Sequence, residues 1–271
     1  MAQAQGIYLK KRYGQHFLRD QSIVDHMIER VTLDAHSSVF EIGCGDGFLT
    51  RAILHTNIKQ LWVFELDPEW AAYVRKELPD PRMQMHEVNI LDQDFSMLDA
   101  DAPWTLLANL PYQITFPILH RLQQSRHRLR EGVIMVQEEV AQKIVKTHGK
   151  GYGHPSLFFQ YYFEWEMLDK IPPTAFLPPP KVFSRLLYFK PRQNLQPIPN
   201  EDAFWDFIKV CFKQPRRTLR NNLVQTHYDI AKIPESTLLL RAQQMAFDDF
   251  LKVWGLISSS PSVPFDSPRC S

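Results

Sequence analysis

Two short motifs carry residue types that do chemistry on a bound ligand. The first, Asn109-Leu110-Pro111-Tyr112, follows an apolar run at 104–108, which predicts a buried strand, and precedes a helical pattern at 114–122. The proline makes a stiff turn after that strand. The turn therefore presents one amide, two backbone carbonyls and one aromatic ring at the carboxyl end of a strand, where open α/β sheets bind their ligands.

The second motif is the glycine-rich stretch Glu41-Ile42-Gly43-Cys44-Gly45-Asp46-Gly47, between a predicted strand at 38–42 and a predicted helix at 48–54. Glycines such as Gly43 and Gly45 let a ligand approach backbone N–H groups at a helix N-terminus. Glu65 ends the next predicted strand, about twenty residues on, where a carboxylate accepts both ribose hydroxyls of a nucleotide. A tight turn beside an exposed acid is the structural alternative.

The glycine spacing, preceded by an acid, fits S-adenosyl-L-methionine better than a dinucleotide, because there is no pyrophosphate to hold and a methionine ammonium and carboxylate must be bound instead. NAD is the competing cofactor. Asn89 follows a short predicted strand at 83–88. Its side-chain carbonyl is a candidate acceptor for the adenine amino group, and an ordinary loop asparagine is the alternative.

With a methyl donor nearby, the Asn109–Tyr112 turn suits methylation of an adenine amine. The lone pair of that amine is delocalised into the ring, so it is a poor nucleophile. The Asn109 side-chain oxygen and the Leu110 carbonyl would accept its two hydrogens and localise the lone pair toward the methyl group. Tyr112 would stack on the unpaired or flipped base, a contact worth about 1–3 kcal/mol. No strong general base is needed.

Strands alternate with helices along the first part of the chain, which predicts an α/β, doubly wound parallel sheet. The stretch 171–181 holds five prolines and is expected to be a stiff, extended connection. A linker with three prolines follows at 190–200, and the rest has a helical pattern only. The predicted organisation is a catalytic domain at 1–190, a helical domain at 198–257 and a disordered tail at 258–271.

Composition narrows the class of protein. The 271 residues are 44% hydrophobic and 23% charged, enough for a sizeable core. No apolar run is long enough to span a membrane and no signal-peptide core is present, so we expect a cytoplasmic protein. The three cysteines are far apart and the ten histidines are scattered, which predicts neither disulfides nor a metal site. The charge pattern gives no oligomer signal, so a monomer is expected.

Net charge is only +1, but the basic residues are clustered. One cluster lies at 10–19, two follow the Asn109–Tyr112 turn, and one at 209–220 contains no acid. A single cluster would be a solvated face, whereas several clusters around one predicted site favour binding to a polyanion.

Six motifs together resemble the KsgA/RsmA/Dim1 family of rRNA adenine dimethyltransferases. Tyr13-Gly-Gln-His-Phe-Leu-Arg-Asp20 is similar to its FGQNFL-x-D opening, and the stretches at 41–50, 64–67 and 109–117 are similar to its EIG-x-G-x-G-x-LT, ELD and NLPY-x-I-[ST]-x-P motifs. FLPPPKVFS at 176–184 and FKQPRRTLRNNL at 212–223 resemble its most specific patterns. The resemblance extends over residues 13–254.

The resemblance implies a Rossmann-like class I methyltransferase sheet with a small all-α C-terminal domain. It implies transfer of four methyl groups to two adjacent adenosines near the 3′ end of small-subunit (16S) rRNA, in an immature small ribosomal subunit. Tyr112 and Phe176 would sandwich the target base. The implied cofactor-binding residues are His16, Leu18, Gly43, Gly45, Glu65, Asn89 and Asn109. The implied RNA-binding residues are Lys10, Lys11, Arg12, Lys209, Lys213, Arg216, Arg217 and Arg220.

Four positions depart from the family pattern. His16 replaces Asn and Asn89 replaces Asp, both at cofactor positions, so we expect a lower cofactor affinity. Phe183 replaces the Asp of PKVDS, and Pro215 replaces an Arg of the basic run. The alternative function is a binding factor that keeps the RNA contact with weak or no catalysis. A dehydrogenase is a distant third, because no catalytic His, Lys and Tyr constellation is evident.

Overall fold

The computed structural model describes residues 3–10 and 14–258. The chain forms two compact units, one built from the residues up to Val145 together with Phe159–Asn194, the other from Lys146–Phe158 and the residues from Leu195 on. The sequence-based boundaries include 146–158 in the first domain. This segment belongs to the second unit because Tyr152 is buried against Phe212 and the Gly149 N–H donates to the Gln243 carbonyl.

A seven-stranded sheet forms the first unit, in the order β6-β5-β4-β7-β8-β11-β9. The parallel strands are β4 (Ser38–Ile42), β5 (Gln60–Glu65), β6 (Met83–Glu87), β7 (Trp104–Asn109) and β8 (Leu129–Gln137). β11 (Ser184–Pro191) runs antiparallel to both β8 and β9 (Phe163–Ile171). The predicted α/β doubly wound sheet is confirmed, with an antiparallel edge that the sequence did not indicate.

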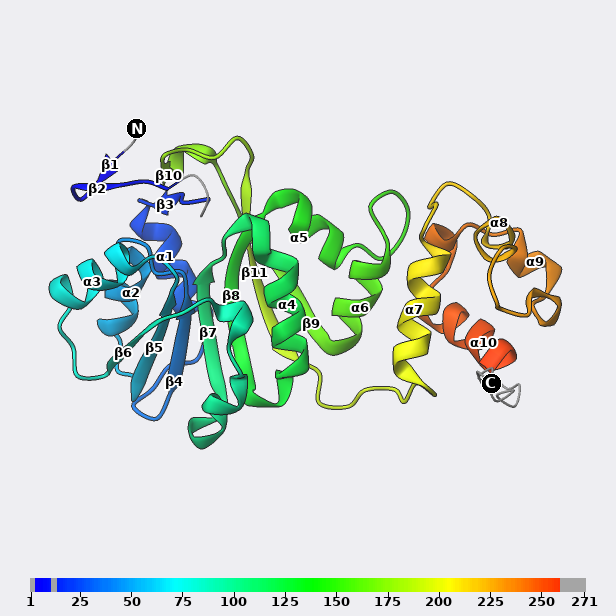
Figure 1. Cartoon of the computed structure of the whole chain (residues 1–271), viewed down its shortest axis with the longest axis horizontal. Helices are drawn as coiled ribbons and strands as arrows, with labels where there is room; N and C mark the ends of the chain where they lie inside the picture. Colours follow the sequence, from blue (N-terminus) through cyan, green and yellow to red (C-terminus); the bar gives the residue numbers. More distant parts are fainter. Residues whose placement is uncertain (1–2, 11–13, 259–271) are drawn as a thin grey trace, which may run out of the picture. The chain divides into compact units, whose positions relative to one another are not determined.

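Helices cover both faces of this sheet (Figure 1). On one face, α1 (Gln21–Glu29), α2 (Phe48–Leu54) and α3 (Pro68–Glu77) bury Met27, Ile53 and Val74 in a core cluster with strand residues such as Val63 and Leu107. The helix α4 (Thr115–Gln124), which connects β7 to β8, lies on the other face, where α5 (Glu138–Val145) also lies. Short 3-10 turns occur at Ile90–Asp92, Phe95–Asp101, Tyr112–Ile114 and Arg126–Arg128.

The N-terminal segment forms a small addition to the sheet. β1 (Gln3–Ala4) and β2 (Ile7–Tyr8) form a hairpin, and β3 (Phe17–Leu18) pairs with β10 (Phe176–Leu177) from the proline-rich segment. That segment also contains a 3-10 turn, Pro173–Ala175. As predicted, it is neither a helix nor a strand of the main sheet. It runs beside the segment that contains His16.

The second unit is helical in its described part. It contains α7 (Glu201–Cys211), α8 (Leu219–Leu223), α9 (Glu235–Leu238) and α10 (Phe247–Ser258), with 3-10 turns at Ile230–Lys232 and Ala242–Gln244. The rings of Phe204, Phe207 and Trp254 pack together in its core. α6 (His154–Tyr162) contributes to both units. The predicted tail beyond Ser258 lies outside the described residues.

No helix in the described part of the chain is both long and apolar enough to cross a bilayer. The same residues contain no cluster of His, Cys, Asp and Glu side chains arranged to hold a metal ion.

Candidate active site

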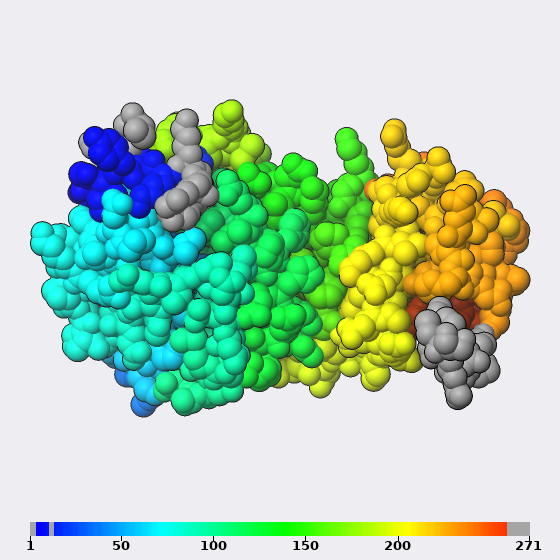
Figure 2. Space-filling model, in the orientation of Figure 1, coloured from blue at the N-terminus to red at the C-terminus, as the bar shows by residue number. Residues whose placement is uncertain are grey.

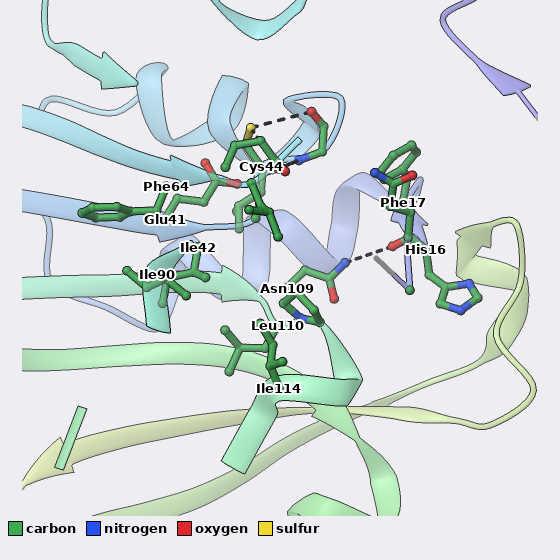
Figure 3. Close-up of a pocket in the computed structure, with 18 of the residues that line it drawn as sticks. His16, Phe17, Glu41, Ile42, Cys44, Phe64, Ile90, Asn109, Leu110 and Ile114 are labelled. Atoms are coloured by element: carbon green, nitrogen blue, oxygen red, sulfur yellow. Dashed lines mark hydrogen bonds between the residues drawn. The ribbon is translucent and has the colours of Figure 1, made fainter. Parts of the chain in front are cut away.

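One cavity collects the two motifs that the sequence singled out. It lies at the carboxyl ends of β4, β5, β6 and β7, and residues 14–18 form a further wall (Figure 3). This is the edge of an open α/β sheet at which ligands bind. Of the predicted site residues, those that line the cavity are His16, Leu18, Gly43, Gly45, Glu65, Asn89, Asn109, Leu110 and Tyr112.

The glycine loop between β4 and α2 needs its glycines for conformation and for space. Gly43, Gly45 and Gly47 all have positive φ angles, of 74°, 54° and 79°. A Cβ added at Gly45 would lie 2.6 Å from the Phe17 ring. The loop therefore packs directly against the N-terminal wall of the cavity, and a side chain at position 45 would push the two apart.

Glu65 is held in place by the loop that it faces. It is 7% exposed, and its carboxylate accepts hydrogen bonds from the N–H groups of Gly45, at 3.1 Å, and Asp67, at 2.8 Å. Burial raises the pKa of Glu65, while the two N–H donors oppose that rise. The carboxylate is thus fixed at the end of β5, where it can accept hydrogen bonds from a ligand's hydroxyl groups.

Glu41, the acid at the end of β4, is a second buried carboxyl group of the cavity. It is 1% exposed and accepts a 2.7 Å hydrogen bond from the Thr50 hydroxyl. Burial, with the nearby charges of Glu65 and Asp46, raises its pKa to about 8. At neutral pH this carboxyl group therefore keeps its proton and forms a polar, uncharged part of the cavity wall.

The raised pKa of Glu41 predicts a pH-dependent stability. The folded protein keeps this proton up to about pH 8, whereas an unfolded chain releases it near 4.5. Between these values the unfolded state binds fewer protons, so the free energy of unfolding falls as the pH rises. We expect the wild type to lose more stability than Glu41→Gln in urea denaturation between about pH 5 and about pH 9. Equal losses in both proteins would contradict this assignment.

Asn109 ends β7 with its side-chain amide oriented. Its Nδ2 donates to the His16 carbonyl at 3.1 Å, drawn as a dashed line in Figure 3. This bond leaves the Asn109 oxygen without a donor among the described residues. The Leu110 N–H donates to the Met135 carbonyl at 3.1 Å, while the Leu110 carbonyl receives no hydrogen bond from the described residues. Two acceptors at adjacent positions are thus available to a ligand at the cavity.

Tyr112 is held at both ends of its side chain. Its hydroxyl lies 2.5 Å from the Ser184 hydroxyl, at the start of β11. Its ring stacks on the His16 imidazole, with centroids 5.9 Å apart and planes at 25°. Burial raises the pKa of Tyr112. The His16 Nδ1 donates to the Pro178 carbonyl at 2.8 Å, so this histidine joins the turn to the proline-rich segment.

Phe176, the predicted partner of Tyr112 at the target base, is a buried residue in this structure. Its side chain is 4% exposed, belongs to the core cluster and does not line the cavity. Pairing of β10 with β3 sets Phe176 opposite Leu18. The ring that stacks on Tyr112 in this structure is His16, and the role of Phe176 at the target base stays a prediction.

Asn89 lines the cavity but also has a local role. Its side-chain oxygen accepts from the Leu91 N–H at 3.1 Å, and its Nδ2 donates to Asp92 at 2.9 Å. It thereby caps the 3-10 turn after β6. An amide oxygen has a second lone pair. Its contact with an adenine amino group therefore stays a prediction.

Lys10 does not offer a free charge to RNA. Its ammonium lies 2.7 Å from both Asp67 and Glu69, and hydrogen bonding to Asp67 and then Glu69 raises its pKa. Asp67 is fully buried and also accepts from the Gln15 amide. Lys10 instead fastens the N-terminal segment to the start of α3. Lys11 and Arg12 lie outside the described residues.

The basic run of the second unit divides into paired and unpaired cations. Lys209 lies 2.9 Å from Asp206, and Arg220 pairs with Glu235. Lys213, Arg216 and Arg217 are exposed and have no acidic partner among the described residues. Among the described members of the predicted RNA-binding set, these three side chains have the charges most available to a ligand.

Several contacts that shape the site had no local signal in the sequence. Arg19 pairs with Asp46 at 2.7 Å and ties the N-terminal wall to the glycine loop. Phe17 packs against Gly45, and Ser184 holds Tyr112. Each of these residues lies inside one of the recognised motifs, so the motifs marked the right segments without showing which side chains meet.

Residues 7–254 match the family model described as "Ribosomal RNA adenine dimethylase". This chain belongs to the ribosomal RNA adenine dimethylase family. The chain is therefore an rRNA adenine methyltransferase, and the cofactor of this family is S-adenosylmethionine.

Curated relatives agree with the family assignment. The chain is 34% identical over 249 residues to ribosomal RNA small subunit methyltransferase A of Chlorobium phaeobacteroides, covering 92% of this chain and 91% of the relative. It is 38% identical to the protein of the same name from Laribacter hongkongensis, covering 79% and 82% of the two chains.

Solved structures confirm the class I methyltransferase fold. A dimethyladenosine transferase from Plasmodium falciparum has a TM-score of 0.74 at 20% identity, covering 88% of this chain and 96% of that one. The 23S rRNA methyltransferase ErmE has a TM-score of 0.67 at 20% identity, covering 90% and 100%.

The residues of the cavity fit the cofactor of this family. S-adenosylmethionine carries several hydrogen-bonding groups, and Glu41 and Glu65 place two buried carboxyl groups at the cavity. The fixed Glu65 carboxylate suits ribose hydroxyls, and the positive φ angles of the glycine loop allow a ligand close to the backbone.

Proposed function

We propose that this chain dimethylates N6 of two adjacent adenosines near the 3′ end of small-subunit rRNA. The observation that carries the proposal is the juxtaposition, around one cavity, of the Asn109 and Leu110 acceptors with the fixed Glu65 carboxylate and the glycine loop. The acceptors suit an adenine amine, and the carboxylate with its loop suits the methyl donor. The names of the relatives support the small-subunit rRNA as substrate.

Two groups of this chain would act on the amine. When bound, the cofactor supplies a methyl group that is electrophilic because it is attached to a sulfonium. The Asn109 oxygen and the Leu110 carbonyl accept the two N–H hydrogens of the adenine amine, which localises its lone pair. The nitrogen becomes strongly acidic only after it is methylated, so no buried general base has to act first. Acceptors already oriented in the protein need no reorganisation during the reaction.

The target adenine must be unpaired or flipped out to reach this cavity. We propose an immature small subunit as the physiological substrate, a monomeric enzyme and a cytoplasmic site of action. We assign a different role to each unit. The cofactor and the target base bind to the first unit, whereas Lys213, Arg216 and Arg217 of the second unit contact RNA phosphates.

The exposed cations of the second unit should make RNA binding depend on the salt concentration. Each cation that neutralises a phosphate of single-stranded RNA contributes about 0.7 to the slope of log K against log salt concentration. We expect replacement of Lys213, Arg216 and Arg217 by alanine to reduce the magnitude of this slope by about 2. Filter binding of unmethylated small-subunit rRNA at several salt concentrations measures it. Lys76→Ala, an exposed lysine of α3, is the control. An unchanged slope in the triple variant would remove these residues from the interface.

A binding factor without catalysis is the second candidate. The observation in its favour concerns Asn89, a predicted cofactor contact. Its side-chain oxygen already accepts from the Leu91 N–H and its amide donates to Asp92, which would weaken its contact with the cofactor. Calorimetry with S-adenosylmethionine separates the two functions. Binding at micromolar concentration supports the enzyme, and no binding at millimolar concentration supports the binding factor.

Transfer of a labelled methyl group from S-adenosylmethionine to unmethylated small ribosomal subunits tests the proposed function. We expect incorporation into the 3′ part of the rRNA with the wild type and little with Asn109→Ala. Absence of incorporation with the wild type, or incorporation that Asn109→Ala leaves unchanged, would refute the proposal.

A further inference from the structure

An exposed aromatic side chain lies beside the catalytic turn. Phe183 is 45% exposed and Val182 is 42% exposed, immediately before β11. The next residue, Ser184, is fully buried and its hydroxyl lies 2.5 Å from the Tyr112 hydroxyl. Phe183 is thus one residue away from a direct contact with Tyr112.

The backbone holds Phe183 in a defined position. Its carbonyl accepts a 3.0 Å hydrogen bond from the Glu138 N–H, at the start of α5. Ser184 continues into β11, where it pairs with Gln137 of β8 and Ile171 of β9. The segment that ends at Phe183 projects from the surface of the first unit, coloured yellow-green in Figure 2. A large ring on a fixed backbone loses little conformational entropy when it binds a partner.

The surroundings of Phe183 are cationic. The Lys170 ammonium lies over its ring, 4.5 Å from the centroid. Lys181 is exposed two residues earlier. Neither lysine has an acidic partner within 4 Å among the described residues, whereas Glu138 is held by Arg185 at 2.7 Å. The Lys170 charge also helps to lower the pKa of Glu138. The ring therefore combines an apolar surface with two nearby lysine charges, in the segment that leads into the Ser184 contact with Tyr112.

We propose that Phe183 and Lys170 form a second stacking site, which binds a nucleotide adjacent to the target adenosine. The base stacks on the exposed Phe183 ring, and Lys170 and Lys181 contact the neighbouring phosphates. This inference rests on the proposed function, because an adenosine bound at Tyr112 brings its neighbours to this part of the surface. An apolar protein segment would cover the ring but leave both lysines without counter-charges, so the charge pattern favours RNA.

The test compares Phe183→Ala and Phe183→Trp in methylation of protein-free 16S rRNA and of intact small subunits. Loss of one base stack predicts a KM for protein-free rRNA raised about five- to one-hundred-fold by Phe183→Ala, with kcat and the Kd for S-adenosylmethionine unchanged. Phe183→Trp keeps the stack and should restore the KM. Leu256→Ala, an apolar side chain of the second unit with 43% exposure, is the control and should leave the KM unchanged.

Fluorescence of the Phe183→Trp variant provides a readout that does not need catalysis. The fluorescence of the added tryptophan is the difference between the variant and the wild type. We expect a single-stranded RNA oligonucleotide to quench this difference. Quenching without methyl transfer by the wild type would refute the proposed function and keep the stacking site. Methyl transfer with an unchanged KM in Phe183→Ala and no quenching would overturn the site. A KM raised only for intact subunits, and not for protein-free rRNA, would also overturn it, by indicating a protein partner.

Discussion

Asn109→Ala should lower the rate of methyl transfer about 10²–10³-fold, the usual effect of removing one oriented hydrogen-bonding group from a transition state. The Asn109 amide is oriented by its bond to the His16 carbonyl, and its side-chain oxygen is the proposed acceptor for the amine. Alanine removes that acceptor and leaves only the Leu110 carbonyl. Single-turnover transfer to unmethylated small-subunit rRNA measures the change in the chemical step.

The control for this prediction is Asn57→Ala. Asn57 is an exposed asparagine that precedes β5, at the opposite edge of the sheet. Exposed positions of this kind change free energies by about 0.5 kcal/mol or less, so its rate should stay within about twofold of wild type. Calorimetry with S-adenosylmethionine checks that the Asn109 variant still binds the cofactor. A full rate in Asn109→Ala would remove this residue from the chemistry.

Glu65→Gln should weaken S-adenosylmethionine binding about ten- to one-hundred-fold. Hydrogen bonds to charged groups contribute about 1.5–3 kcal/mol, and 1.4 kcal/mol corresponds to one factor of ten. Glu65 accepts from the Gly45 and Asp67 N–H groups through different carboxylate oxygens, so Gln keeps only one of these two hydrogen bonds. The substitution therefore removes the charge and one orienting contact, and calorimetry reports the combined loss as a higher Kd.

Glu77→Gln is the matched control, because Glu77 is a partly exposed acid at the end of α3. Its Kd should equal that of wild type. If Glu65→Gln also bound the cofactor as tightly as wild type, the ribose contact would have to be assigned to another residue. A Kd raised equally by both substitutions would indicate a general electrostatic effect and not a contact.

The sheet and its cavity were predictable because their signals are local. Apolar runs marked β4, β5 and β7, and the end of each strand carried the residue that now lines the cavity: Gly43, Glu65 and Asn109. Strand β9 was missed because its exposed positions Glu164, Glu166, Asp169 and Lys170 interrupt the apolar pattern of an edge strand. Edge strands commonly carry such charges, which prevent pairing with other chains.

The side-chain partners were not predictable, because they come from distant parts of the sequence. Lys10 was assigned to RNA from a basic cluster, yet its partner Asp67 lies 57 residues away. Phe176 was assigned to the target base from a motif, which could not show that its side chain is buried with residues of distant segments in the core cluster. A motif identifies the segment that reaches a site, whereas the packing of the whole unit decides which ring of that segment is exposed.

The central claim is that the Asn109–Tyr112 turn methylates N6 of adenosine in small-subunit rRNA. The most direct measurement is mass analysis of nucleosides from unmethylated small subunits incubated with the protein and S-adenosylmethionine. We predict N6,N6-dimethyladenosine at two adjacent positions near the 3′ end with the wild type, and its near absence with Asn109→Ala. Methylation confined to another base or atom, or the same dimethyladenosine yield from the variant in an early time course, would contradict the account.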